Sequence, residues 1–179
     1  MRLYDYVASS YTLLANCLLD SADTKTATEY YRKAIAVRVT LSEKSPNSSA
    51  NRGALAECDA NLAKAVGPSN RNDALKQYSN AVELLEHLIT VDRSNAQHRI
   101  ALADALSSTA WLYTRVAEQN GEPSARLQYW TNAKSFYQRS QELWLELDKA
   151  GKLPPARVRA IRETRGELAR CNEALRRNQ

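Results

Sequence analysis

Apolar residues return along the chain at helical spacing, and one arrangement of them occurs three times. In residues 27–41, "ATEYYRKAIAVRVTL", a small, an aromatic, a small and two aliphatic residues follow at intervals of four, three, three and four. The same spacing returns in "ALKQYSNAVELLEHL" (74–88) and "AKSFYQRSQELWLEL" (133–147). Because residues three and four apart share one face of an α-helix, each copy predicts an amphipathic helix with a buried stripe. The stripes are Ala27, Tyr31, Ala34, Val37 and Leu41; Ala74, Tyr78, Ala81, Leu84 and Leu88; and Ala133, Tyr137, Ser140, Leu143 and Leu147.

A second helical segment precedes each stripe, over residues 4–20, 49–66 and 96–118, and a seventh follows the last one, over 156–177. Runs rich in Gly, Pro, Ser, Asp and Asn separate the segments, as expected where helices end and begin. These runs are "SADTK" (21–25), "KSPNSS" (44–49), "GPSN" (67–70), "DRSN" (92–95), "QNGEPS" (119–124) and "AGKLPP" (150–155). No segment alternates apolar and polar residues as a strand would. The pattern therefore predicts an all-α chain of seven helices.

The paired helices resemble tetratricopeptide (TPR) repeats. The second helix of such a repeat has the small–aromatic–small order, and the first has a Leu followed by a small residue, as in Leu14–Ala15, Leu62–Ala63 and Leu168–Ala169. The resemblance implies a right-handed α-solenoid of about three helix pairs and a capping helix, because one hairpin cannot bury its stripe alone. It places the repeats at about 4–45, 48–93 and 95–150 and the capping helix at about 156–177, in a single domain of residues 1–179.

The repeats depart from the common pattern in length. Their period exceeds 34 residues, and the proline that usually follows the second helix arrives late, at Pro46 and Pro154. Long repeats of this kind resemble C-terminal regions appended to bacterial Ser/Thr kinases and related signalling proteins. We therefore expect the sequence to be a fragment of a larger protein.

The bulk composition fits a globular chain: 44% of the residues are hydrophobic and 25% are charged. No stretch approaches the roughly 18 apolar residues of a membrane-spanning helix, so we expect no membrane insertion. The N-terminus, "MRLYDYVASSYTLL", lacks the continuous apolar segment of a signal peptide. These features predict a cytoplasmic location, unless the parent protein is anchored in a membrane.

The whole net charge of +5 lies in the C-terminal segment. Residues 151–179 hold eight Lys or Arg against three acidic residues, and the rest of the chain is balanced. A terminal repeat needs a polar outer face, and cations suit the C-terminus of a helix, so a capping role explains the charge. Nucleic-acid binding is the weaker alternative, because the segment lacks aromatic residues for stacking on bases.

No motif of known catalytic or cofactor chemistry occurs in the sequence. It lacks the GxxxxGK[ST], GxGxxG and HExxH patterns. The two histidines, His87 and His98, have no metal-like spacing, and Cys17, Cys58 and Cys171 form no CxxC pair. We expect surface or helix-end roles for the histidines and buried, reduced side chains for the cysteines. The sequence therefore predicts no enzymatic activity, no cofactor and no metal site.

The three tryptophans, Trp111, Trp130 and Trp144, lie in or beside the apolar stripes. Core packing is the expectation for each of them, because a large aromatic side chain gains most from burial. Trp144 should pack against the last helix.

In tetratricopeptide repeats the first helices of the pairs line a concave side that holds a peptide or a helix of a partner. Carried over one by one, the family's groove positions fall on residues that are mostly small or polar. They are Ser9, Thr12 and Asn16 in the first repeat, Glu57 and Lys64 in the second, Ser107 and Thr114 in the third, and Glu163 and Arg170 in the last helix. The resemblance thus implies a protein partner, or another domain of the parent protein.

Some members of the family bind a C-terminal carboxylate with Lys, Asn and Arg residues in this groove. Here Thr12 stands in place of the first Lys, and Ser107 and Trp111 stand in place of later basic residues, which disfavours such a ligand. Two other functions stay open: a structural spacer, and a homodimerisation element whose groove is empty.

Overall fold

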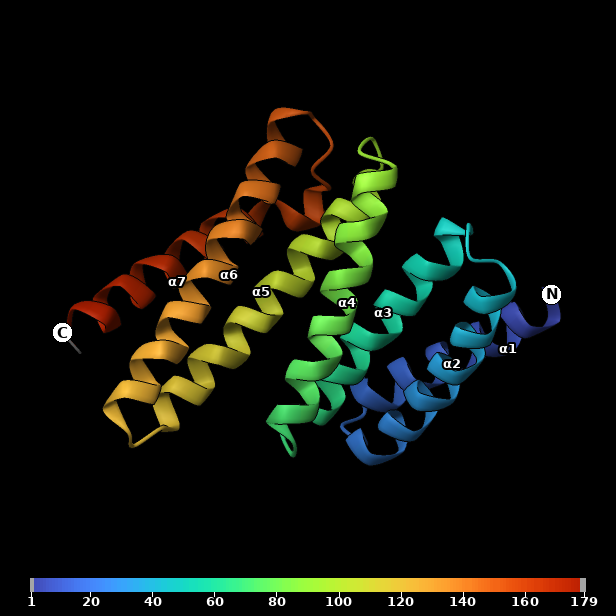
Figure 1. Ribbon diagram of the computed structural model, residues 1–179, viewed down its shortest axis with the longest axis horizontal. Helices are drawn as coiled ribbons and strands as arrows, with labels where there is room; N and C mark the ends of the chain where they lie inside the picture. The colour runs from blue at the N-terminus through green and yellow to red at the C-terminus, as the bar shows by residue number, and fades with distance from the viewer. Residues whose placement is uncertain (1, 178–179) are drawn as a thin grey trace. The chain divides into compact units, whose positions relative to one another are not determined.

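The computed structural model describes residues 2–177, which form seven α-helices and one short 3-10 helix (Figure 1). No strand occurs among these residues, and the prediction of an all-α chain is confirmed. The elements are α1 (Arg2–Asp20), α2 (Thr24–Lys44), α3 (Ser49–Val66), α4 (Arg71–Val91), α5 (Ala96–Gln119), α6 (Pro123–Lys149), η1 (Pro155–Arg157) and α7 (Val158–Arg177).

Each predicted break contains a boundary between two elements, because the residues there satisfy the free groups of helix ends. The side chains of Ser48, Asn70 and Asn95 each accept a hydrogen bond from the backbone N–H three residues later, at 3.3, 3.1 and 3.2 Å. Such N-terminal caps stabilise the first turn. Pro123 opens α6 in the first turn, where its missing N–H costs nothing. After α6, Gly151 adopts a φ of 64°, a left-handed conformation that glycine tolerates.

The chain divides into two compact units, and the division falls in the predicted break at 92–95. The N-terminal unit (Met1–Asp92) contains α1 to α4, and the C-terminal unit (Arg93–Gln179) contains α5 to α7. The single domain and the repeat boundaries at 4–45, 48–93 and 95–150 stay predictions.

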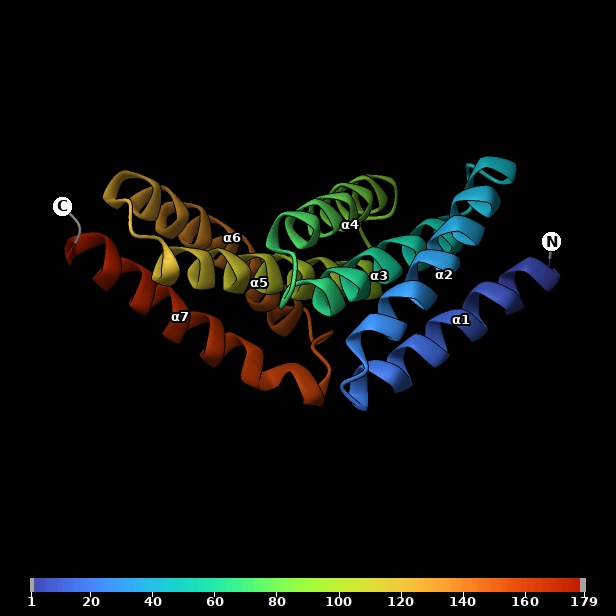
Figure 2. The ribbon, with the colours of Figure 1, turned by 90° about the horizontal axis from the view of Figure 1, so that it is seen from below.

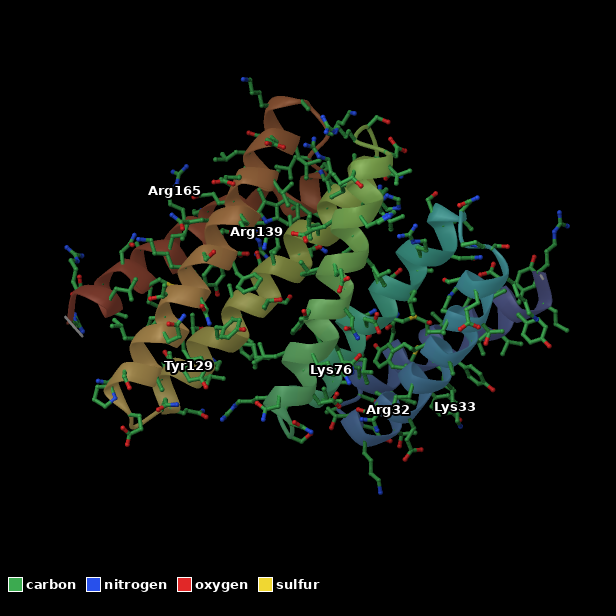
Figure 3. The ribbon with its side chains drawn as sticks, in the orientation of Figure 1. Arg32, Lys33, Lys76, Tyr129, Arg139 and Arg165 are labelled. Atoms are coloured by element: carbon green, nitrogen blue, oxygen red, sulfur yellow. The ribbon has the colours of Figure 1, made fainter. Side chains whose placement is uncertain are left out.

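In the N-terminal unit most of the predicted stripe residues of α2 and α4 are buried in the core, whereas Val37 and Leu84 are only partly buried. Tyr31 and Tyr78 are buried, and alanines one turn before and after each ring have no exposed surface, so neighbouring helices approach closely. Helix α1 lies at the outer edge of this unit with α2 alongside it (Figure 2). On the side of α2 and α4, Arg32 pairs with Asp73 at 3.1 Å, and Arg32 and Lys76 extend outward (Figure 3).

In the C-terminal unit α6 packs against both α5 and α7. One cluster joins Trp130 and Tyr137 of α6 to Leu168 and Cys171 of α7. A second cluster forms around Trp144, which has 1% of its surface exposed and packs with Ile161 of α7. The prediction that Trp144 packs against the last helix is confirmed.

Two expectations about burial are wrong. Trp111 is 49% exposed although core packing was expected. Cys17 is exposed, whereas Cys58 and Cys171 are buried as expected. Leu14 also differs from the residues that match it in the repeat pattern, because it is 42% exposed whereas Leu62 and Leu168 are buried. Both Leu14 and Cys17 lie on the outer side of the edge helix α1.

Candidate functional site

The three candidate groove residues of α1 are held by other side chains of the N-terminal unit. Ser9 accepts a hydrogen bond from the buried guanidinium of Arg38 at 2.9 Å. Asn16 accepts one from the Tyr31 hydroxyl at 2.6 Å. Burial raises the pKa of Tyr31 to about 12, so this hydroxyl stays protonated and remains a donor.

Thr12 of α1 lies against Cys58 of α3, with 3.3 Å between the hydroxyl oxygen and the sulfur. Because the Thr12 hydroxyl donates to the carbonyl of Ala8 at 3.0 Å, the thiol is left to donate to the Thr12 oxygen. Burial raises the pKa of Cys58, which keeps the thiol protonated. Thr12 therefore links α1 to α3, and its main contacts are within the fold.

Glu57 and Lys64 of α3 differ from these three residues, because both are exposed. They lie seven residues apart and so occupy one face of the helix. Neither makes an ion pair or a side-chain hydrogen bond within the part of the chain that the structure describes. These two charges are free to meet a partner.

In the C-terminal unit the candidate residues of α5 are turned inward. Thr114 is fully buried, and its hydroxyl donates to the carbonyl of Trp111 at 2.7 Å. Ser107 lies 2.7 Å from Ser140 of α6, whose hydroxyl donates to the carbonyl of Ala103 at 2.8 Å, so Ser107 is the donor between the two serines. Ser107 therefore links α5 to α6, whereas the hydrogen bond of Thr114 stays within α5, and the exposed surface is left to their neighbours.

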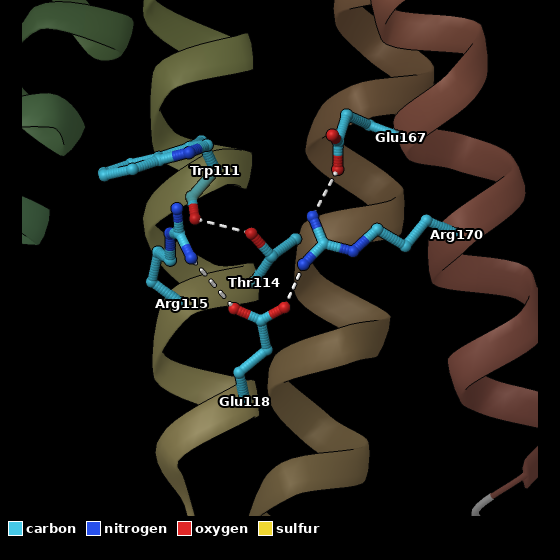
Figure 4. Close-up of polar contacts among 6 residues, drawn as sticks. All are labelled: Trp111, Thr114, Arg115, Glu118, Glu167 and Arg170. Carbon is cyan, nitrogen blue, oxygen red and sulfur yellow. Dashed lines mark hydrogen bonds and ion pairs between the residues drawn. The ribbon is translucent and has the colours of Figure 1, made fainter.

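Those neighbours form a continuous polar chain that begins beside an exposed tryptophan (Figure 4). The guanidinium carbon of Arg115 lies 5.2 Å from the centre of the Trp111 ring, and Arg115 also pairs with Glu118 at 3.4 Å. Glu118 in turn accepts from Arg170 of α7. Arg170 pairs at 3.1 Å with Glu167, so one guanidinium joins carboxylates of two helices.

Helical spacing explains why these side chains gather. Trp111, Arg115 and Glu118 are four and three residues apart on α5, and Glu167 and Arg170 are three apart on α7. Ala110 and Ala117 of α5 and Leu168 of α7 belong to one buried cluster with Trp130 and Tyr137 of α6, so both helices pack on α6 and Arg170 can reach Glu118. We call the surface formed by Trp111, Arg115, Glu118, Glu167 and Arg170 the Trp111 surface.

Of the nine predicted groove residues, only Arg170 belongs to the Trp111 surface. Glu163 lies on α7 near Arg159, with 3.8 Å between their charged atoms, one turn before Glu167. The sequence did hold the missing signal, because Trp111 and Arg115 lie four and eight residues after Ser107 and therefore on its face of the helix. This signal was missed because Trp111 was expected to be buried.

Local ion pairs neutralise much of the basic C-terminal segment. Arg157 pairs with Asp104 at 2.8 Å, and Arg176 and Arg177 both pair with Glu173, at 2.6 and 2.8 Å. Arg162 and Arg165 are exposed and make no ion pair among the described residues, and Arg165 extends into solvent (Figure 3). Two unpaired arginines on one helix offer few contacts to the phosphate backbone of a nucleic acid.

Within residues 2–177 no group of three or more His, Cys, Asp or Glu side chains is arranged to hold a metal ion. None of the helices in that range combines the length and the hydropathy needed to cross a membrane.

The sequence of residues 8–38, which covers most of α1 and α2, matches the tetratricopeptide repeat family. No curated protein matches the chain. The first hairpin is thus similar to a tetratricopeptide repeat, and the all-helical fold of the remaining chain agrees with a helical-repeat protein. Repeats of this family generally mediate protein–protein interactions.

Proposed function

We propose that this chain is a non-enzymatic protein-interaction module and that the Trp111 surface binds a peptide or a helix of a partner. One observation carries the proposal: a tryptophan 49% exposed on α5, a first helix of the predicted repeats, with a guanidinium over its ring. Tryptophan and arginine are the residues most enriched among those that dominate binding energy at protein interfaces.

The chemistry of the surface favours a ligand with an apolar or aromatic side chain. The exposed indole offers an apolar contact, Arg115 lies over its ring, and the charges of Arg115, Glu118 and Arg170 continue to one side of it as paired ions. Because these charges already satisfy one another, a partner can cover them without leaving an unpaired ion in the interface. An apolar centre with a polar rim is the usual composition of a binding surface.

In the N-terminal unit we propose that Glu57 and Lys64 contact a partner, while Ser9, Thr12 and Asn16 support the surface on which those two charges stand. The support for this division is that both charges are exposed and unpaired, whereas the three residues of α1 are engaged within the unit.

The biological setting follows only from the resemblance of the long repeats. On that basis we propose a cytoplasmic regulatory or scaffold role within a bacterial signalling protein, with the partner supplied by another protein or by another part of the same one. A structural spacer is the competing function, and it requires no ligand at the Trp111 surface.

Selection of random 12-residue peptides displayed on phage against the immobilised chain tests the proposal. Enriched peptides should contain aromatic or branched aliphatic residues, and Trp111→Ala should weaken their binding about 30-fold, as truncation of a dominant contact does. Leu145→Ala is the matched control, because Leu145 is a 43% exposed apolar residue on α6 outside the surface. If the selected peptides bind the Trp111→Ala and Leu145→Ala variants equally well, the proposal is wrong.

A further inference from the structure

Helix α1 exposes an apolar face that nothing in the N-terminal unit covers. Leu3, Tyr6 and Leu13 are 72%, 68% and 66% exposed, which are large fractions for side chains of this size. Ser10 and Cys17, between and beyond them, are exposed as well. An apolar face of this extent on an otherwise polar protein indicates an interaction surface.

The spacing of the exposed residues is that of a coiled coil. Positions 3, 6, 10, 13 and 17 alternate intervals of three and four, which is the a/d spacing of a heptad repeat. On the opposite side of α1, Ala8 and Ala15 are seven residues apart and have no exposed surface. One side of α1 therefore packs on its own unit, and the other presents a heptad seam, which we define as Leu3, Tyr6, Ser10, Leu13 and Cys17.

We propose that the heptad seam of α1 binds the same seam of a second copy, with the two helices antiparallel. This inference is independent of the function proposed for the Trp111 surface. The seam is complementary to itself in that orientation, because large side chains then lie opposite small ones. Tyr6 faces Cys17 of the second copy, and Ser10 faces its Leu13. The twofold axis repeats both layers, so these four side chains meet spaces of the right size, and Leu3 lies at the end of the seam beside Asp20 of the second copy.

The charges at the ends of α1 favour the same orientation. Arg2 begins the helix and Asp20 ends it, and neither makes an ion pair within the described residues. An antiparallel arrangement brings Arg2 of one copy to Asp20 of the other at both ends. A parallel arrangement would instead place the two arginines together and the two aspartates together, which costs free energy.

The size of the seam sets the strength that we expect. Burying five side chains per copy, at on the order of 100 Å² each, removes on the order of 1,000 Å² from water in total. That area is at the low end for specific interfaces. The self-association should therefore be reversible and appear at micromolar to tens of micromolar chain concentration.

Sedimentation velocity over a concentration series tests the pairing. The chain should convert from monomer to dimer as its concentration rises, and Leu13→Glu should abolish the dimer across the whole series. Leu145→Glu, at a comparable exposed leucine on α6, should leave the dimer unchanged. Because Leu13 is 66% exposed, its replacement should not alter the helical circular dichroism spectrum. A monomer at every concentration, or a dimer that survives Leu13→Glu, overturns the inference.

Oxidative cross-linking tests the orientation. In the antiparallel register the two Cys17 side chains are roughly 16 Å apart along the helix axis, so the unaltered chain should form no disulfide-linked dimer. Tyr6→Cys should form one, because position 6 faces Cys17 of the second copy. Tyr4→Cys is the matched control: Tyr4 is 51% exposed but lies off the seam, with the Lys44 ammonium 5.2 Å from its ring centre.

A charge exchange completes the test. Arg2→Glu should weaken the dimer, and adding Asp20→Arg to the same chain should restore it. Cross-linking of the unaltered chain through Cys17, or equal cross-linking of the Tyr4→Cys and Tyr6→Cys variants, overturns the antiparallel pairing.

Discussion

The first and last helices of the chain, α1 and α7, use their apolar residues in opposite ways. In α7 the apolar stripe of Ile161, Leu168 and Leu175 is turned toward the C-terminal unit, and arginines occupy the outer side. In α1 the largest apolar side chains are on the outer side, and two fully buried alanines provide the inner contact.

The difference shows that amphipathic pattern alone does not reveal which side of a helix is buried. Both helices have one apolar face, and an outer helix face that stays in water needs polar side chains. Helix α7 meets that need with arginines that are largely paired to nearby acids, such as Arg176 with Glu173 at 2.6 Å. Helix α1 does not, and this is why we infer a partner for α1 and none for the outer side of α7.

The largest effect on stability is expected when a side chain that packs against α7 is removed. Trp144→Ala should lower the free energy of unfolding of the C-terminal unit by about 3–5 kcal/mol, because the ring is 1% exposed and its loss leaves a cavity beside Ile161. Urea denaturation followed by circular dichroism measures this change. Trp111→Ala deletes the same side chain from an exposed position and should cost less than about 1 kcal/mol. Equal costs would mean that the packing of α7 is misassigned.

A buried carboxylate distinguishes α3 from α7 at one aligned position. Asp59 of α3 is 4% exposed. When Leu62–Ala63 of α3 is matched with Leu168–Ala169 of α7, Asp59 corresponds to Arg165, which is exposed. Burial raises the pKa of Asp59 from 3.8 to about 7. Between these two values the folded state holds a proton that the unfolded state has lost, so stability falls as the pH rises from about 4 to about 7.

The loss amounts to at most about 4 kcal/mol, which is the free energy of three pKa units. Asp59→Asn cannot ionise and should remove most of this pH dependence, making the N-terminal unit more stable than the unaltered chain at pH 8. Thermal unfolding at pH 5 and pH 8 measures both effects. A melting temperature that changes with pH in the same way in both proteins would contradict the assignment.

A smaller effect should follow from loosening α1. The guanidinium of Arg38 is buried and donates to Asp5 and Ser9, while its Nε has no partner. Asp5→Ala removes the opposing charge, which should cost about 1–2 kcal/mol because Asp5 itself is half exposed. Hydrogen exchange of the α1 amides should then accelerate. Glu29→Ala, which removes an exposed carboxylate of α2 that makes no ion pair among the described residues, should leave the exchange of the α1 amides unchanged.

Local sequence was sufficient for the helices and their limits. Ser48, Asn70 and Asn95 cap the helices that follow them, and caps of this kind depend on residues only three positions apart. The tyrosines of the stripes were predictable for the same reason, since Tyr31, Tyr78 and Tyr137 are all buried where the repeat places them. The candidate site was harder to predict from the sequence. Arg170 and Glu118 are 52 residues apart and meet only through the packing of α5 with α6 and of α6 with α7.

The sequence by itself determined that the chain is all-α, where the breaks between helices lie, and that the stripe tyrosines of α2, α4 and α6 are buried. These properties depend on helical periodicity and on capping, which act over a few residues. Only the tertiary structure decided that Thr114 is enclosed while Trp111 is exposed, and that α1 turns its leucines outward. The face that a helix buries depends on which neighbours cover it, and those neighbours come from distant parts of the chain.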